Sequence, residues 1–180
     1  MGKLRWCVAL ILAAAISLIG PMQDAHAYTL HGYKWNSKSM IVDLRASTSD
    51  YRTAFVAAVK EYYANTHLFI SYTVADCAPF TGRNGGYGAT GWEGQTITVY
   101  NASTNLVSTA ESKLNGYYLP TTLPAARLKV VALHELGHGL GINHVTSKTD
   151  PMYPSASAAY LNGATKISQD MINGINKVYP

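Results

Sequence analysis

Three histidines and a glutamate are concentrated in the stretch HELGHGLGINH, which runs from His134 to His144. The chain has six histidines in 180 residues, so half of them lie in this one segment. His134 and His138 are four residues apart, and on a helix this spacing places both imidazoles on one face, about one turn apart. Gly141 can end the helix and turn the chain back, which would bring His144 to the same place. The spacing predicts one zinc ion held by three imidazoles, with a fourth coordination position left open.

Glu135 follows the first histidine directly, where it can face the open position without being a ligand. A water molecule on zinc ionises near neutral pH, and a carboxylate beside it can take the proton as the water attacks a peptide carbonyl. The same group, once protonated, can pass the proton to the departing amine. We therefore expect Glu135 to be the general base and then the general acid of an endopeptidase. The alternative is a zinc-containing protein that binds peptides without cutting them, which would need the histidines but not Glu135.

The extended motif resembles the zinc-binding motif H-E-x-x-H-x-x-G-x-x-H of the metzincin endopeptidases. Downstream, DPMYP (150–154) resembles their methionine turn, and ISQDMINGIN resembles the closing helix of the matrixin branch. The resemblance covers nearly all of residues 28–180, although only the last third carries specific motifs. It implies an α+β fold with a metzincin-like twisted mixed sheet, an active-site helix, and a small C-terminal subdomain closed by a helix. It also implies that Met152 lies under the zinc as an apolar base for the imidazoles.

The same resemblance implies where a substrate would bind, because metzincins hold a peptide as an added antiparallel strand along a sheet edge. The glycine-rich segment 81–94 is either a flexible loop or such an edge strand, and within it Tyr87–Trp92 is the candidate edge. The residues after the methionine turn would form a wall of the pocket beside the scissile bond. The expected substrate-binding residues are Gly88, Ala89 and Thr90 on the edge, and Pro154, Ser155 and Ala156 after the turn.

Several positions depart from the matrixin pattern. Val145 follows the third histidine where matrixins usually have serine, and Met171 replaces the second acidic residue of the closing helix. The loss of that acid predicts that a carboxylate contact bracing the methionine turn is missing. No His-x-Asp with accompanying histidines precedes the motif, so a second, structural zinc is not expected. Calcium binding stays open, since no acidic cluster identifies a site for it.

The first 27 residues have the organisation of a secretory signal peptide. Lys3 and Arg5 precede an apolar run from Val8 to Ile19, and Ala25-His26-Ala27 matches an A-x-A cleavage site. An uncleaved membrane anchor is the alternative, but it would need about 20 apolar residues. We expect residues 1–27 to be removed, and residues 28–180 to form one secreted, extracellular metalloprotease domain without membrane contact. No room for an inhibitory prosegment follows Ala27, so the protease is expected to be active on export or restrained by a separate protein inhibitor.

Composition limits the partners further. The formal net charge of +4 is spread along the chain and forms no basic stripe, so nucleic acid is not an expected partner. The expected partner is a protein or peptide substrate, and the protein is expected to be a monomer.

Of the two cysteines, Cys7 leaves with the signal peptide, which excludes an internal disulfide in the exported chain. Cys77 is expected to be a buried apolar side chain; an intermolecular bridge or a thiol that blocks zinc is the alternative.

Hydrophobic periodicity places the remaining elements. Apolar residues at spacings of three and four predict a helix that begins near Ser49 or Asp50 and buries Ala54, Phe55, Ala58, Val59 and Tyr62. The histidine motif is predicted to lie on a helix that begins near Pro124, and a final helix is predicted to be capped by Ser168. β-Branched and aromatic residues predict three strands, over residues 40–45, 68–74 and 95–101.

Overall fold

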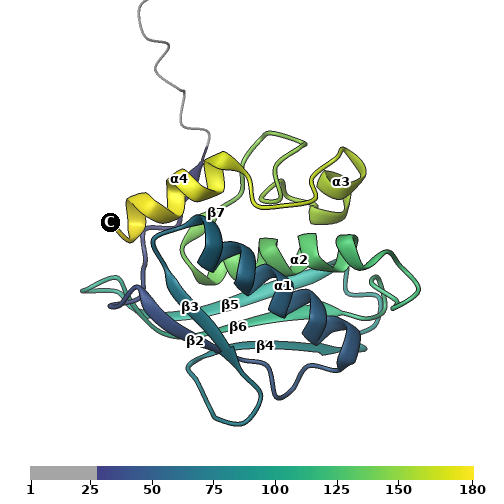
Figure 1. Ribbon diagram of the computed structural model, residues 1–180, viewed down its shortest axis with the longest axis horizontal. Coiled ribbons are helices and arrows are strands. Elements are labelled where there is room, and N and C mark those ends of the chain that lie inside the picture. Colours follow the sequence, from purple (N-terminus) through teal and green to yellow (C-terminus); the bar gives the residue numbers. More distant parts are fainter. Residues whose placement is uncertain (1–27) are drawn as a thin grey trace, which may run out of the picture.

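The computed structural model describes residues 28–180, and the predicted signal peptide, residues 1–27, lies outside them. Five strands form one mixed sheet in the order β3-β2-β4-β6-β5 (Figure 1). β5 pairs antiparallel with β6 and forms an edge of the sheet, whereas the other neighbours are parallel. The strands of this sheet are β2 (Ser39–Asp43), β3 (Phe69–Thr73), β4 (Phe80–Gly85), β5 (Gly94–Asn101) and β6 (Leu106–Asn115).

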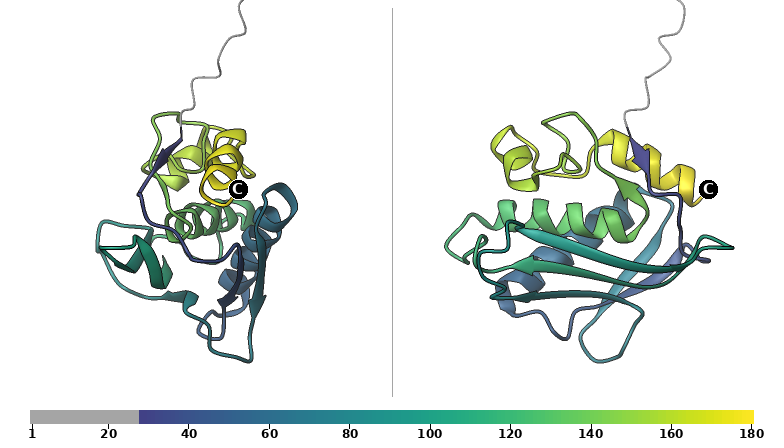
Figure 2. Two further views of the ribbon diagram at one scale, coloured as in Figure 1. Left: turned by 90° about the vertical axis from the view of Figure 1, so that its left-hand side faces the viewer. Right: turned by 180° about the vertical axis from the view of Figure 1, so that it is seen from behind.

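Two long helices, α1 (Ser49–Asn65) and α2 (Ala125–Gly139), cover the same face of the sheet (Figures 1 and 2). All five side chains predicted to form the buried face of α1 are buried. The Tyr62 hydroxyl, fully buried, donates a hydrogen bond of 2.7 Å to the carbonyl of Leu133 on α2. This bond joins α1 to the turn of α2 that carries the first histidine, so the position of α2 is fixed from the core.

The chain after α2 forms a small C-terminal part on the side of α2 that faces away from the sheet (Figure 2). It contains β7 (Ile142–Asn143), α3 (Ala156–Leu161) and α4 (Gln169–Val178). The two-residue strand β7 pairs antiparallel with β1 (Thr29–Leu30). Ser168 caps α4 as predicted, because its hydroxyl accepts a hydrogen bond of 3.0 Å from the backbone N–H of Met171. The α+β architecture and the closing helix are therefore confirmed.

The prediction of an edge strand over Tyr87–Trp92 is wrong. These residues form a loop between β4 and β5, and the true edge begins at Gly94. Gly88 and Gly91 have φ angles of +76° and +83°, which an extended strand does not contain. The buried Asn115 holds the loop, because its amide group donates to the carbonyls of Gly88 and Trp92 at 2.9 and 3.2 Å.

Cys77 also differs from its prediction, since its side chain is exposed rather than buried. It lies in the loop between β3 and β4, outside the layers that form the core, and Arg45 donates a hydrogen bond of 2.8 Å to its sulfur. Within residues 28–180, no helix has the length and apolar character needed to cross a membrane.

Candidate metal centre and active site

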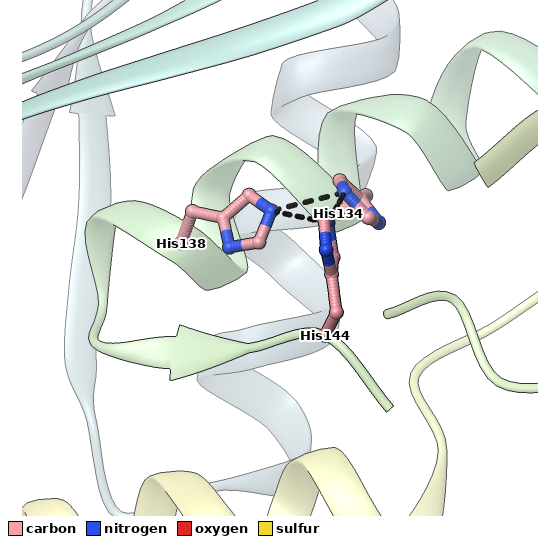
Figure 3. Close-up of side chains that lie close together, drawn as sticks. All are labelled: His134, His138 and His144. Carbon is pink, nitrogen blue, oxygen red and sulfur yellow. Dashed lines mark hydrogen bonds between the residues drawn. The ribbon is translucent and has the colours of Figure 1, made fainter. Parts of the chain in front are cut away.

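The three predicted ligands converge at the C-terminal end of α2 (Figure 3). The Nε2 atom of His138 lies 3.0 Å from that of His134 and 3.1 Å from that of His144, and the third pair is 3.2 Å apart. Nitrogen ligands about 2.0–2.1 Å from a tetrahedral zinc ion are about 3.3 Å from one another. Within residues 28–180 these three form the one group of metal-ligating side chains whose donor atoms converge in this way.

The tautomers of two of the imidazoles follow from their carbonyl neighbours. Nδ1 of His134 lies 2.7 Å from the carbonyl oxygen of Pro151, and Nδ1 of His138 lies 2.9 Å from that of Ile142. A carbonyl only accepts hydrogen bonds, so each Nδ1 carries the proton and each Nε2 presents a lone pair. Burial lowers the pKa of His134 to about 4 and that of His138 to about 3, which keeps both rings neutral near pH 7.

Neutral imidazoles with facing lone pairs cannot hydrogen-bond to one another through Nε2. A cation at their centre removes this conflict, and imidazole nitrogen is a preferred ligand of Zn²⁺. The donor set, its spacing and its tautomers thus fit zinc. His134, His138 and His144 would hold the ion, and the carbonyls of Pro151 and Ile142 would orient two of the rings from behind.

The turn that delivers His144 depends on Gly141. Its φ angle is +97°, and a Cβ atom there would come within 2.6 Å of the carbonyl oxygen of Tyr33. The glycine therefore satisfies both the backbone conformation and the close approach of the N-terminal segment. That segment also contacts the ligands themselves: the Thr29 hydroxyl donates to the carbonyl of His144, and Nε2 of His31 lies 3.3 Å from Nδ1 of His138. Sequence reasoning missed these contacts, because nothing local links residues 29–33 to the histidines.

The predicted methionine turn packs against α2, the helix that carries His134 and His138. Met152 is fully buried, and its sulfur lies against Gly137 of α2, between the first two ligands in sequence. Asp150 braces the turn by accepting hydrogen bonds from the backbone N–H of Met152, at 2.7 Å, and from the hydroxyl of Ser168. Asp150 is not the acid that Met171 replaces: it is a carboxylate of the turn itself, and through Ser168 it joins the turn to the start of α4.

Glu135 is buried beside the histidines, and burial raises its pKa to about 8. A hydrogen bond from Thr96 opposes this rise, and the nearby negative charge of Glu93 adds to it. The metal-free protein therefore keeps this carboxyl group largely protonated at neutral pH. A cation at the histidines would favour the ionised form, which a general base requires.

A cleft of about 580 Å³ contains Glu135 and all three histidines. It lies between the start of β5 and the segment that follows the methionine turn. Of the predicted substrate-binding residues, Pro154, Ser155 and Ala156 line it, whereas Gly88, Ala89 and Thr90 do not. Because the edge strand was placed too early in the chain, four residues at or directly before the start of β5 that line the cleft were missed: Glu93, Gly94, Gln95 and Thr96. Tyr118, after β6, and Arg127, on α2, also line it, and no local pattern links them to the histidines.

Similar segments occur in known proteins. The 46% identity to a putative matrix metalloproteinase of Spodoptera frugiperda ascovirus 1a extends over 48 residues, 26% of this chain and 12% of that protein. Interstitial collagenase of Equus caballus is 45% identical over 49 residues, 27% of this chain and 10% of that protein. Stromelysin-2 of Rattus norvegicus is 42% identical over 52 residues, 29% of this chain and 11% of that protein. The matching segments are thus a small part of each of these relatives.

The matrixin family model matches a much longer stretch, residues 67–180. This match covers well over half of the chain and contains four of the five strands of the sheet as well as the histidine segment and the methionine turn. The chain accordingly belongs to the matrixin family.

Proposed function

We propose that the protein is a secreted zinc endopeptidase whose single catalytic ion is held by His134, His138 and His144. The observation that carries this proposal is the convergence of three Nε2 atoms, 3.0 to 3.2 Å apart, in a cleft that also contains the buried Glu135. When bound there, zinc supplies a Lewis acid for the peptide carbonyl and lowers the pKa of water.

Glu135 performs the proton transfers in this proposal. Its carboxylate takes a proton from the attacking water and then donates that proton to the amine of the leaving peptide. Both steps use one group, because the acid formed in the first step is the donor needed in the second. Met152 would hold α2, the helix that carries His134 and His138, in place through its contact with Gly137.

The substrate peptide would bind in extended form along the edge strand β5. The side of β5 that faces away from β6 has no neighbouring strand in the sheet, so its backbone N–H and C=O groups can pair with an added antiparallel strand. Pro154, Ser155 and Ala156 would form the opposite wall. Gly88, Ala89 and Thr90 would act indirectly, by shaping the loop that leads into β5.

The proposal includes the processing of the chain. Residues 1–27 would direct export and be removed, and residues 28–180 would act as one monomeric catalytic domain on protein or peptide substrates. This domain would be active on export or restrained by a separate protein inhibitor. N-terminal sequencing of the exported protein tests the first part. A first residue of Tyr28 is expected, and any other start would correct the boundary.

The enzyme proposal is tested with purified wild-type protein and Glu135→Gln, using zinc analysis and a library of peptides. One zinc ion per chain is expected in both, with peptide cleavage reduced about 10²- to 10⁴-fold in Glu135→Gln. Glu111→Gln is the matched control, because Glu111 pairs with Arg83 and Lys113 on the sheet and does not line the cleft. A wild-type protein that binds zinc and peptides but cleaves none would favour the non-catalytic binding protein instead.

A further inference from the structure

Two hydroxyl groups of the sheet, one on β5 and one on β6, contact Glu135. The Thr96 hydroxyl of β5 lies 2.8 Å from Oε2 of Glu135 and 2.7 Å from its backbone carbonyl oxygen. Ser112 of β6, which pairs with Thr96 in the register of the sheet, places its hydroxyl 3.0 Å from the same backbone carbonyl. The two hydroxyl oxygens are themselves 3.0 Å apart. Ser112 is fully buried, so solvent does not compete for this group.

The number of protons assigns the direction of these bonds. Each hydroxyl has one proton to donate. When Glu135 is ionised, as a general base must be, its carboxylate and its backbone carbonyl only accept hydrogen bonds. Ser112 then donates to the backbone carbonyl, and Thr96 donates to Oε2. A hydrogen bond from a neutral hydroxyl to an ionised carboxylate is stronger than one between neutral groups, so this arrangement favours the charged form of Glu135.

Gly94 confines the other oxygen of the carboxylate. It lies two residues before Thr96, on the same face of β5, and a Cβ atom at this position would come within 2.3 Å of Oε1. Within residues 28–180, Oε1 of Glu135 has no hydrogen-bond partner. Gly94 and Glu135 both line the cleft. One oxygen is thus anchored to the sheet, and the other occupies the space left by the missing side chain.

We propose that Thr96, supported by Ser112, is a positioning residue for the general base: it anchors Oε2 so that Oε1 is the oxygen that exchanges protons with the reacting groups. This inference rests on the proposed function. It assigns to the edge strand a second task besides pairing with a substrate peptide, since the strand that would align the peptide also sets the orientation of the base. We therefore expect catalysis to require a hydroxyl group at residue 96.

The kinetic test compares Thr96→Val, Thr96→Ala and Thr96→Ser in the zinc-loaded full-length protein. Removal of the hydroxyl is expected to lower kcat about 10- to 100-fold, with KM and zinc content unchanged, because the lost bond goes to a charged group. Thr96→Ser keeps the hydroxyl and is expected to stay within about threefold of wild type. Thr81→Val is the matched control: Thr81 lies on β4, its hydroxyl donates to the carbonyl of Ala110, and it does not line the cleft.

A second readout does not depend on activity. The chain has four glutamates, so the side-chain carboxyl carbon of Glu135 can be assigned by ¹³C NMR from the signal that Glu135→Gln removes. In the zinc-free protein, Thr96→Val is expected to move this signal, and Thr81→Val to leave it in place. The inference is overturned if Thr96→Val keeps kcat within twofold of wild type, if the signal does not move, or if Thr96→Ser is as impaired as Thr96→Val. Failure of the proposed function has a different signature, since the wild-type protein would then cleave no peptide.

Discussion

The sulfur of Met152 lies so close to Gly137 that a methyl group added to this glycine would come within 2.7 Å of it. Gly137 is on α2 between His134 and His138, and Met152 follows Pro151, whose carbonyl oxygen orients the ring of His134. The two residues therefore join the helix that carries two ligands to the turn that supports one of them. A change at their contact is expected to affect both stability and metal binding.

Gly137→Ala tests this contact. Alanine is favoured over glycine in a helix interior by about 1 kcal/mol, but overpacking of a buried site costs about 1–3 kcal/mol. We expect a net loss of up to about 2 kcal/mol in the free energy of unfolding, together with weaker zinc binding. Denaturant unfolding and zinc titration measure the two effects. Gly86→Ala is the control, because a methyl group there meets nothing within 4 Å, and equal results for both variants would contradict the expected clash.

Zinc removal should destabilise the folded protein, because the ion binds the native arrangement of ligands. At a free zinc concentration 100 times the Kd, the gain in unfolding free energy is about 2.7 kcal/mol. Thermal unfolding of the wild type should therefore shift upward as zinc is added to chelator-treated protein. His138→Ala should abolish the shift, and His67→Ala should keep it, since His67 is exposed and outside the cleft. A shift that persists in His138→Ala would place the stabilising ion elsewhere.

The pKa of Glu135 makes stability depend on pH in the zinc-free protein. Burial raises this pKa from 4.5 to about 8, so between these values the folded state binds one more proton than the unfolded state. Stability contributed by the protonated group is present at low pH and is lost as the pH rises through 8. From about pH 5 to about pH 8, wild type should lose up to about 1.4 kcal/mol of unfolding free energy per pH unit relative to Glu135→Gln.

Denaturant unfolding of both zinc-free proteins at stepped pH measures this difference. The lowered pKa values of His134 and His138 act in both proteins and cancel in the comparison. Parallel stability curves over this range would show that the carboxyl group titrates with its ordinary pKa despite burial.

Asn115 should be required for the loop that precedes the edge strand. Its side chain donates to two loop carbonyls and accepts from the backbone N–H groups of Tyr87 and Tyr117, each at 3.1 Å. Asn115→Ala leaves these groups unpaired, and we expect a loss of about 2–4 kcal/mol and faster proteolysis between residues 86 and 92. Limited proteolysis in the Glu135→Gln background avoids self-cleavage.

The exposed Asn101 provides the comparison for Asn115. Its side chain accepts from the backbone N–H groups of Ser103 and Thr104 in a surface turn, so Asn101→Ala should cost less than about 1 kcal/mol. Similar losses for the two variants would indicate that the buried hydrogen bonds of Asn115 contribute no more to stability than the exposed ones of Asn101.

The two long helices were predictable because their apolar positions repeat at helical spacing and face one core. The convergence of His134, His138 and His144 was predictable because two of them share a helix face and Gly141 marks the turn to the third. Strand β6 was not, since it buries Ser112 and Asn115, polar residues whose partners lie on α2 and in the loop before β5. β6 also buries Val107, Ala110 and Leu114, but polar residues among its buried positions interrupt the alternation from which strands are predicted. Missing β6 also misplaced the edge, because β5 is identified as the edge only by its pairing with β6.

The pairing of β1 with β7 places the N-terminal segment beside the three histidines. The two strands pair over only two residues each, and the Thr29 hydroxyl bonds to the carbonyl of a ligand 115 residues later in the chain. During synthesis β1 therefore cannot pair with β7 until most of the polypeptide has emerged. In the proposed enzyme the ion site is therefore complete only after His144 has been synthesised, and a chain that stops before residue 142 would lack both the third imidazole and β7, the strand that pairs with β1.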